Sequence, residues 1–148
     1  MGKYGCALLV ALLAAAGAAG CGGDEPLSKA AYIEKGDAIC KKSDAKVGKA
    51  AEKAFADLGE NEMPTEKQLA PFVEDTLKPE VESQISELRD LSPPKADEDK
   101  LNKIYDDVES GLAKIEDNPK ILLEEGNDPL EEPNKAAQDY GFKVCGQS

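Results

Sequence analysis

The composition of this chain changes abruptly around Cys21, and the change limits which part of it can fold into a domain. An uncharged run rich in alanine and leucine, Ala7–Ala16, precedes the cysteine, and the sequence after it is rich in lysine, aspartate and glutamate. The run is shorter than the ~20 residues of a transmembrane helix, and the glycines around Cys21 disfavour a buried core helix. With Lys3 ahead of it, the run has the layout of a secretory signal. We therefore expect residues 1–20 to be a signal peptide that is removed.

The stretch Ala18-Ala19-Gly20-Cys21 resembles the lipobox of bacterial lipoproteins. The resemblance implies that the Cys21 thiol receives a diacylglyceryl group and, after cleavage and acylation with a fatty acid such as palmitate, becomes the new N-terminus. Two or more acyl chains give stable anchoring. Residues 21–27 would then be the lipidated cysteine and a flexible tether, on the extracytoplasmic face of the cell membrane. The alternative is an ordinary cleaved signal that leaves Cys21 as a thiol.

The remaining residues, 28–148, are enough for one domain. The full chain has a net charge of −12 at pH 7, contains no histidine and has Arg89 as its only arginine. This composition argues against nucleic-acid binding, which needs a basic face. Without histidine, a Ser-His or Cys-His nucleophile system is also excluded. We accordingly expect a protein that is not an enzyme and that uses no cofactor or metal.

Two of the four cysteines are available for pairing within the domain. Cys6 leaves with the signal peptide and Cys21 is consumed by the lipid, so Cys40 and Cys145 remain. Outside the cytoplasm such a pair is expected to be oxidised, although two unpaired buried thiols are the alternative. Zinc is not expected, because two cysteines without histidine cannot fill its coordination shell. The sequence predicts a Cys40–Cys145 disulfide.

Apolar residues recur at helical spacing along the domain. Ser28 is a good N-cap for a first helix over residues 29–57, and Thr65 with Gln68 forms a capping-box signal for the second. The third is expected between residues 97 and 117. The predicted apolar seams are Ile33, Cys40, Val47 and Ala54 in the first helix, Leu69, Val73, Leu77, Val81, Ile85 and Leu88 in the second, and Leu101, Ile104, Tyr105, Val108, Leu112 and Ile115 in the third.

Prolines and glycines place the interruptions. Pro71 and Pro79 cannot donate backbone hydrogen bonds, so the second helix must be kinked or split near Lys78. Short helices are expected over residues 121–125 and from about residue 129 or 133 to 140, ended by Gly141. No alternating pattern typical of strands is visible. The predicted fold is all-α, a small antiparallel bundle of three long helices and a broken fourth, closed by one disulfide.

Acidic clusters are the remaining candidates for chemistry. We interpret them as solvated helix faces, because no calcium-loop motif is present. A carboxylate-pair hydrolase ranks last among the functions considered. The clusters are Asp97-Glu98-Asp99, Asp106-Asp107-Glu109, Glu116-Asp117 and Asn127-Asp128 with Glu131-Glu132.

The order of motifs resembles that of small, uncharacterised helical lipoproteins of high-GC Gram-positive bacteria. It consists of the lipobox, a helix containing Ala-Ile-Cys, a Leu-Ser-Pro-Pro break and a terminal Tyr-Gly-Phe-Lys-Val-Cys-Gly. The resemblance implies anchoring and a disulfide, not an activity. We expect a non-enzymatic binding or envelope-interaction module; the alternative is a carrier of a small apolar ligand, in a bundle cavity opened by the kinks at Pro71 and Pro79.

The first predicted helix is rich in lysine, although the chain as a whole is acidic. The preferred interpretation is that its lysines complement acidic neighbours within the bundle. The alternative is that they attract the helix weakly to an anionic lipid or polymer surface. The residues concerned are Lys41, Lys42, Lys46, Lys49 and Lys53.

Overall fold

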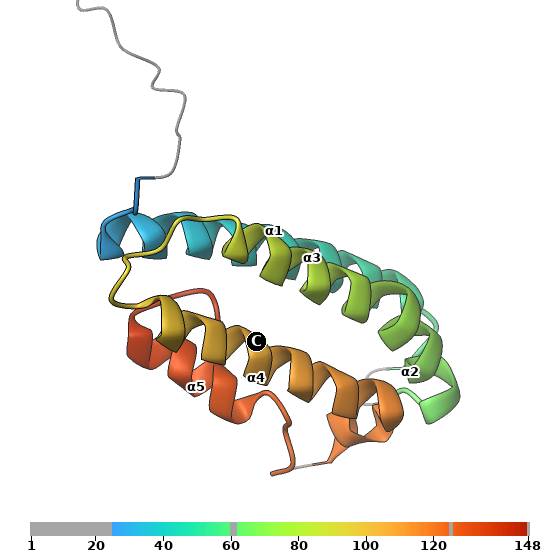
Figure 1. The fold of residues 1–148 in the computed structure, drawn as a ribbon. Coiled ribbons are helices and arrows are strands. Elements are labelled where there is room, and N and C mark those ends of the chain that lie inside the picture. Colours follow the sequence, from blue (N-terminus) through green and yellow to red (C-terminus); the bar gives the residue numbers. More distant parts are fainter. Residues whose placement is uncertain (1–24, 60–61, 125, 148) are drawn as a thin grey trace, which may run out of the picture.

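The computed structural model describes residues 25–59, 62–124 and 126–147, and its described chain is all-helical, as predicted (Figure 1). The predicted signal peptide and the lipidation site Cys21 lie outside the described residues. The helices are α1 (Lys29–Ala54), α2 (Glu66–Phe72), a π-helical turn η1 (Val73–Leu77), α3 (Lys78–Arg89), α4 (Glu98–Asp117), a 3₁₀ turn η2 (Pro119–Leu123) and α5 (Glu131–Tyr140).

Helix α1 begins where the sequence predicts, because the Ser28 hydroxyl accepts a hydrogen bond from the backbone N–H of Ala31 at 3.3 Å. It ends at Ala54, three residues before the predicted end, and Ala54 itself is exposed. The predicted seam is therefore only partly right: of its members, Cys40 is buried, while Ile33 and Val47 are half-buried. The buried row is instead Tyr32, Gly36, Cys40 and Ser43.

The small residues in that row allow close packing between elements. A Cβ on Gly36 would lie 2.5 Å from a ring carbon of Phe142 and 3.3 Å from a methyl carbon of Leu88. Glycine and serine carry no hydrophobic signal, so a pattern of large apolar residues misplaces the buried face by about one position. The buried row of α1 is thus set by close approach as well as by hydrophobicity.

The predicted split of the second helix is confirmed. Pro71 lies inside α2 and Pro79 at the start of α3, and the π-helical turn η1 lies between them. The Lys78 N–H donates to the carbonyl of Val73, five residues earlier, so the backbone stays hydrogen-bonded while it shifts register. The helix therefore continues through the interruption with a changed face.

The predicted third helix is confirmed as α4, and Asn118 with Pro119 begins a short helix, as expected. That helix is the 3₁₀ turn η2, which starts two residues before the predicted residue 121. Helix α5 begins at Glu131, between the two predicted starts at residues 129 and 133, with Leu130 at the N-cap position. The Asp128 carboxylate accepts from the Leu130 N–H at 2.8 Å and so orders the turn that leads into α5. Gly141, with φ of 122°, ends α5 as predicted.

The helices form two layers (Figure 1). Helix α1 packs beside α3 in one layer, α4 packs beside α5 in the other, and the layers meet where α3 contacts α4. Helices α3 and α4 run in opposite directions, joined by the chain around Pro93 and Pro94. The predicted antiparallel bundle is confirmed, and its two layers define the space described next.

Candidate ligand-binding cavity

A cavity of about 710 Å³ lies between the two layers, with walls from α1, η1, α3, α4, η2, α5 and the C-terminal tail. Outside the C-terminal tail, six aliphatic side chains that line the cavity are half-buried, although four of them belong to the seams that the sequence assigns to the core. These side chains stay partly exposed because the facing layer does not cover them. They are Val47, Leu77, Val81, Val108, Ile121 and Leu130.

The sequence placed a possible cavity at the proline kinks, and the structure places it between the layers instead. Pro71 and Pro79 are exposed and contribute no wall. Their effect is indirect: the π-helical turn between them carries Leu77, which lines the cavity, and the following α3 contributes Val81. The kink therefore shapes one wall but does not open the space.

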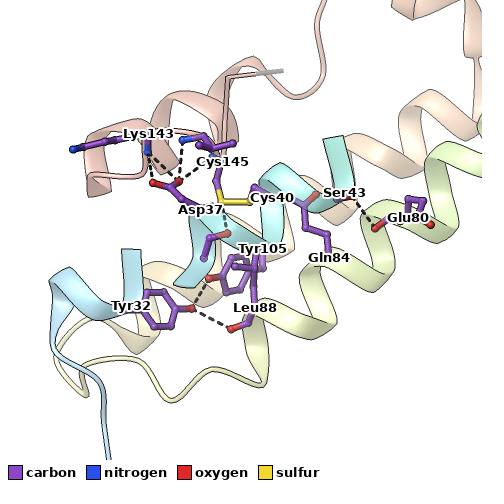
Figure 2. The surroundings of a disulfide bond; sticks show 12 residues. Tyr32, Asp37, Cys40, Ser43, Glu80, Gln84, Leu88, Tyr105, Lys143 and Cys145 are labelled. Atoms are coloured by element: carbon purple, nitrogen blue, oxygen red, sulfur yellow. Dashed lines mark hydrogen bonds between the residues drawn. A yellow bond between two sulfur atoms is a disulfide. The ribbon is translucent and has the colours of Figure 1, made fainter. Parts of the chain in front are cut away.

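Tyr105 lines the cavity and is hydrogen-bonded to a second buried tyrosine, Tyr32 (Figure 2). The Tyr32 hydroxyl lies 2.6 Å from the Tyr105 hydroxyl and 3.2 Å from the Leu88 carbonyl. Because a carbonyl can only accept, Tyr32 donates to Leu88 and Tyr105 donates to Tyr32. Burial is the main cause that raises the pKa of both tyrosines above the ordinary value. These hydroxyls are neutral members of a satisfied network and not proton donors for catalysis.

The predicted disulfide joins Cys40 on α1 to Cys145 in the tail, and both residues line the cavity (Figure 2). Their Cα atoms are 5.3 Å apart, within the usual range for a disulfide. Gln84 donates from its amide nitrogen to the Cys40 sulfur at 3.2 Å. The bond therefore holds the tail against α1 as part of the cavity wall.

Asp37 provides a second attachment for the tail. Its carboxylate accepts backbone N–H bonds from Lys143, Val144 and Cys145 at distances between 2.9 and 3.2 Å (Figure 2). Phe142 inserts beside Gly36 and is only 4% exposed. The disulfide was predicted from the sequence, but the role of Asp37 was not, because a carboxylate on a helix gives no signal for a partner about 106 residues away.

Charged groups at the cavity are mostly acidic. Asp44 on α1 and Glu124 and Asp128 between η2 and α5 line it, with Lys143 as the one basic lining residue of the described chain. Glu124 accepts from the Asn127 side chain at 2.9 Å and Asp128 from the Leu130 backbone, so each is held by its own loop. Partial burial raises the pKa of Asp44.

The acidic clusters that the sequence singled out are spread over the surface, and several of their members are engaged by cations or, in the case of Asp97, by the Tyr140 hydroxyl. Arg89 pairs with Asp106 at 2.8 Å and with Glu109 at 3.3 Å, and Lys78 pairs with Glu116 at 2.7 Å. Among the described residues, no three Asp, Glu, Cys or His side chains gather in a way that could hold a metal ion.

The lysines of α1 divide into two groups. Lys42 pairs with Glu87 at 3.3 Å and Lys46 with Glu80 at 2.9 Å, so both tie α1 to α3 as the preferred alternative expected. Lys41, Lys49 and Lys53 make no ion pair with any residue of the described chain. Within that same part, no helix is both long and apolar enough to cross a membrane.

Comparisons with protein-family models, with curated proteins and with solved structures found no match to this chain. Its function is therefore argued from the cavity and its surroundings.

Proposed function

We propose that this protein is a lipid-anchored, extracytoplasmic binding protein that holds a small, largely apolar molecule in the cavity between its two layers. The observation that carries the proposal is the volume of about 710 Å³ walled by half-buried aliphatic side chains. Ligand sites typically have volumes of ~300–1,000 Å³ and mostly apolar walls with few polar groups. Covering apolar surface gains ~25 cal/mol per Å², so a ligand with an apolar body is favoured there.

The sequence before the domain supports the location. A signal-like run and the lipobox-like residues ending at Cys21 favour attachment to the outer face of the cell membrane. The eight residues from Cys21 to Ser28, which precede α1, span at most ~29 Å when extended. The cavity would then work next to a bilayer, the natural source or destination of poorly soluble molecules. No catalytic step belongs to this proposal; the carboxylates of Asp106, Glu109 and Glu116 are held in ion pairs.

The test is occupancy of the cavity in the protein as its host produces it. Native mass spectrometry should find a retained small molecule, and a photoreactive dodecanol carrying a diazirine should label cavity-lining peptides of the protein held in phosphatidylcholine nanodiscs. Val108→Phe adds volume at a half-buried wall position and should reduce both signals. Met63→Phe, at a 62% exposed position outside the cavity, is the matched control.

A clean mass without any bound molecule, together with no cavity labelling by the alkanol, would overturn the proposal. Equal labelling of the wild type and of Val108→Phe would also count against it, provided that circular dichroism shows the helical fold in both. Labelling lost in Met63→Phe as well would indicate that the probe reports surface adsorption.

A second candidate role rests on the free lysines of α1. We propose that Lys41, Lys49 and Lys53, which have no ion-pair partner in the described chain, give α1 a weak attraction to an anionic lipid or polymer surface. Five lysines of α1 should be replaced together by glutamine: Lys41, Lys42, Lys46, Lys49 and Lys53. We expect the variant to bind anionic vesicles more weakly at low salt. Binding that is unchanged by the replacement, or by salt, would eliminate this role.

A further inference from the structure

The charges around the cavity point to a narrower class of ligand, and this inference rests on the proposed binding function. We propose that the cavity binds an amphiphilic cation, a molecule with an apolar body and an amine or other cationic end that pairs with the Asp44 carboxylate. Three observations support it. The cavity walls are apolar, the Asp44 carboxylate has no partner in the described chain, and no cation of the described chain is placed to pair with an anionic ligand.

Asp44 is the carboxylate that a ligand can reach. It lies on α1 next to Ser43, which is buried, and one turn beyond Cys40, and all three line the cavity. Asp44 makes no hydrogen bond or ion pair with any residue of the described chain, in contrast to Glu124 and Asp128, which are held within their loop. Asp44 is exposed although it lines the cavity, so a ligand and solvent can both reach its carboxylate, and partial burial against the apolar wall raises its pKa. A cation bound beside it favours the charged form.

The same cavity disfavours an anionic ligand. The only basic residue that lines the described cavity is Lys143, and its side chain extends away from Cys40 and Ser43 in Figure 2. The Lys143 backbone N–H donates to Asp37 and is therefore not free to bind an anionic ligand. A fatty-acid carboxylate would therefore lie near three acidic side chains without a facing cation, which is unfavourable by the repulsion of like charges.

The polar groups also define where the head of the ligand lies. Ser43 and Gln84 sit beside Asp44 on the α1–α3 wall: the Ser43 hydroxyl is 3.5 Å from the Glu80 carbonyl, and the Gln84 amide contacts the Cys40 sulfur. Val108 of α4 and Ile121 of η2 face this layer from across the cavity, whereas Leu77 of η1 lies on the same side as α3, which directly continues η1. We assign the cationic end to the Asp44 side of α1 and the apolar body to the space in front of Leu77, Val108 and Ile121.

The experiment compares three photoreactive probes of one chain length, each with a diazirine: dodecylamine, dodecanol and dodecanoate. Labelling of cavity peptides is measured by mass spectrometry on the host-produced protein in phosphatidylcholine nanodiscs. Asp44→Asn is compared with Asp139→Asn, which makes the same charge change at an exposed site outside the cavity. Each probe is also competed with its unlabelled form, which corrects for partition into the lipid.

In the wild type and in Asp139→Asn, the amine should label the cavity about five- to tenfold more efficiently than the alkanol, and the dodecanoate less than either; a tenfold ratio corresponds to about 1.4 kcal/mol. Asp44→Asn should remove the amine preference and leave alkanol labelling unchanged. Alkanol labelling without any amine preference, or a preference for the dodecanoate, overturns the cationic assignment and leaves the binding function standing. Failure of all three probes to label the cavity overturns the binding function itself.

Discussion

Removal of the Cys40–Cys145 bond, by replacing both residues with alanine, tests how the domain is held together. The bond links positions 105 residues apart and closes nearly the whole domain into one loop. In the chain-entropy model, a loop of this length restricts the unfolded chain by ~4.7 kcal/mol at 25 °C. A domain of this size is typically stable by only ~5–15 kcal/mol, so the double variant should be close to the limit of folding.

Those molecules of the double variant that do fold should nevertheless keep the native structure. The tail keeps its three backbone bonds to Asp37 and the burial of Phe142 against Gly36, both independent of the sulfur atoms. The loss of stability should therefore come mainly from the unfolded state. In urea titrations followed by far-ultraviolet circular dichroism, we expect ΔG of unfolding to fall by 3–5 kcal/mol, about the range for loss of a native disulfide, and the slope m to rise because the unfolded chain exposes more surface.

Reduced wild-type protein is the control, since it lacks the bond without any change of sequence and should match the double variant. A loss of less than about 1 kcal/mol in both would refute the loop-entropy reasoning. Wild-type protein that carries two free thiols before reduction would show that the bond itself is absent.

Two further predictions concern packing and ionisation. Gly36→Ala places a Cβ 2.5 Å from a Phe142 ring carbon and should lower the free energy of unfolding by about 1–3 kcal/mol in urea titrations. Gly48→Ala, whose Cβ would meet no atom within 4 Å, should stabilise the fold slightly. Equal effects of the two substitutions would contradict the packing account. Tyrosine pKa values are raised in the fold, so the contribution of these tyrosines to stability should be constant below about pH 10 and be lost above it. Tyrosinate absorbance near pH 10 should stay low in the folded protein and be higher in the protein unfolded in urea. A gradual rise of the absorbance near pH 10 in the folded protein would contradict the prediction. The tyrosines are Tyr32, Tyr105 and Tyr140.

The helical architecture was predictable because its signals are local. The α4 seam from Leu101 to Ile115 repeats at helical spacing, and nearly all of it is buried in the fold. Ser28 and Gly141 mark helix ends through the chemistry of single residues. The disulfide followed from counting cysteines. These features need only the sequence near each residue, or the number of one residue type.

The cavity depended on information that is not local. Leu77, Val81 and Val108 have the same periodic signal as their buried neighbours, and only the facing layer decides whether such a side chain is covered. Periodicity therefore predicts a filled core where the structure has an open wall. The tail attachment at Asp37 was missed for the same reason, because its partners are distant in sequence. The sequence did suggest a kink between Pro71 and Pro79, but not how it shapes the space.

If the protein is exported as proposed, the tail that completes the cavity wall affects the order in which the binding site is formed. The segment from Phe142 to Gln147 follows every described helix in the chain, yet it contributes a wall and one half of the disulfide. In a chain delivered N-terminus first, the helices therefore reach the cell exterior before their cavity can be finished. The capacity to bind would arise last, after emergence of the tail and oxidation of Cys145, so an incompletely exported or unoxidised molecule would be anchored but empty.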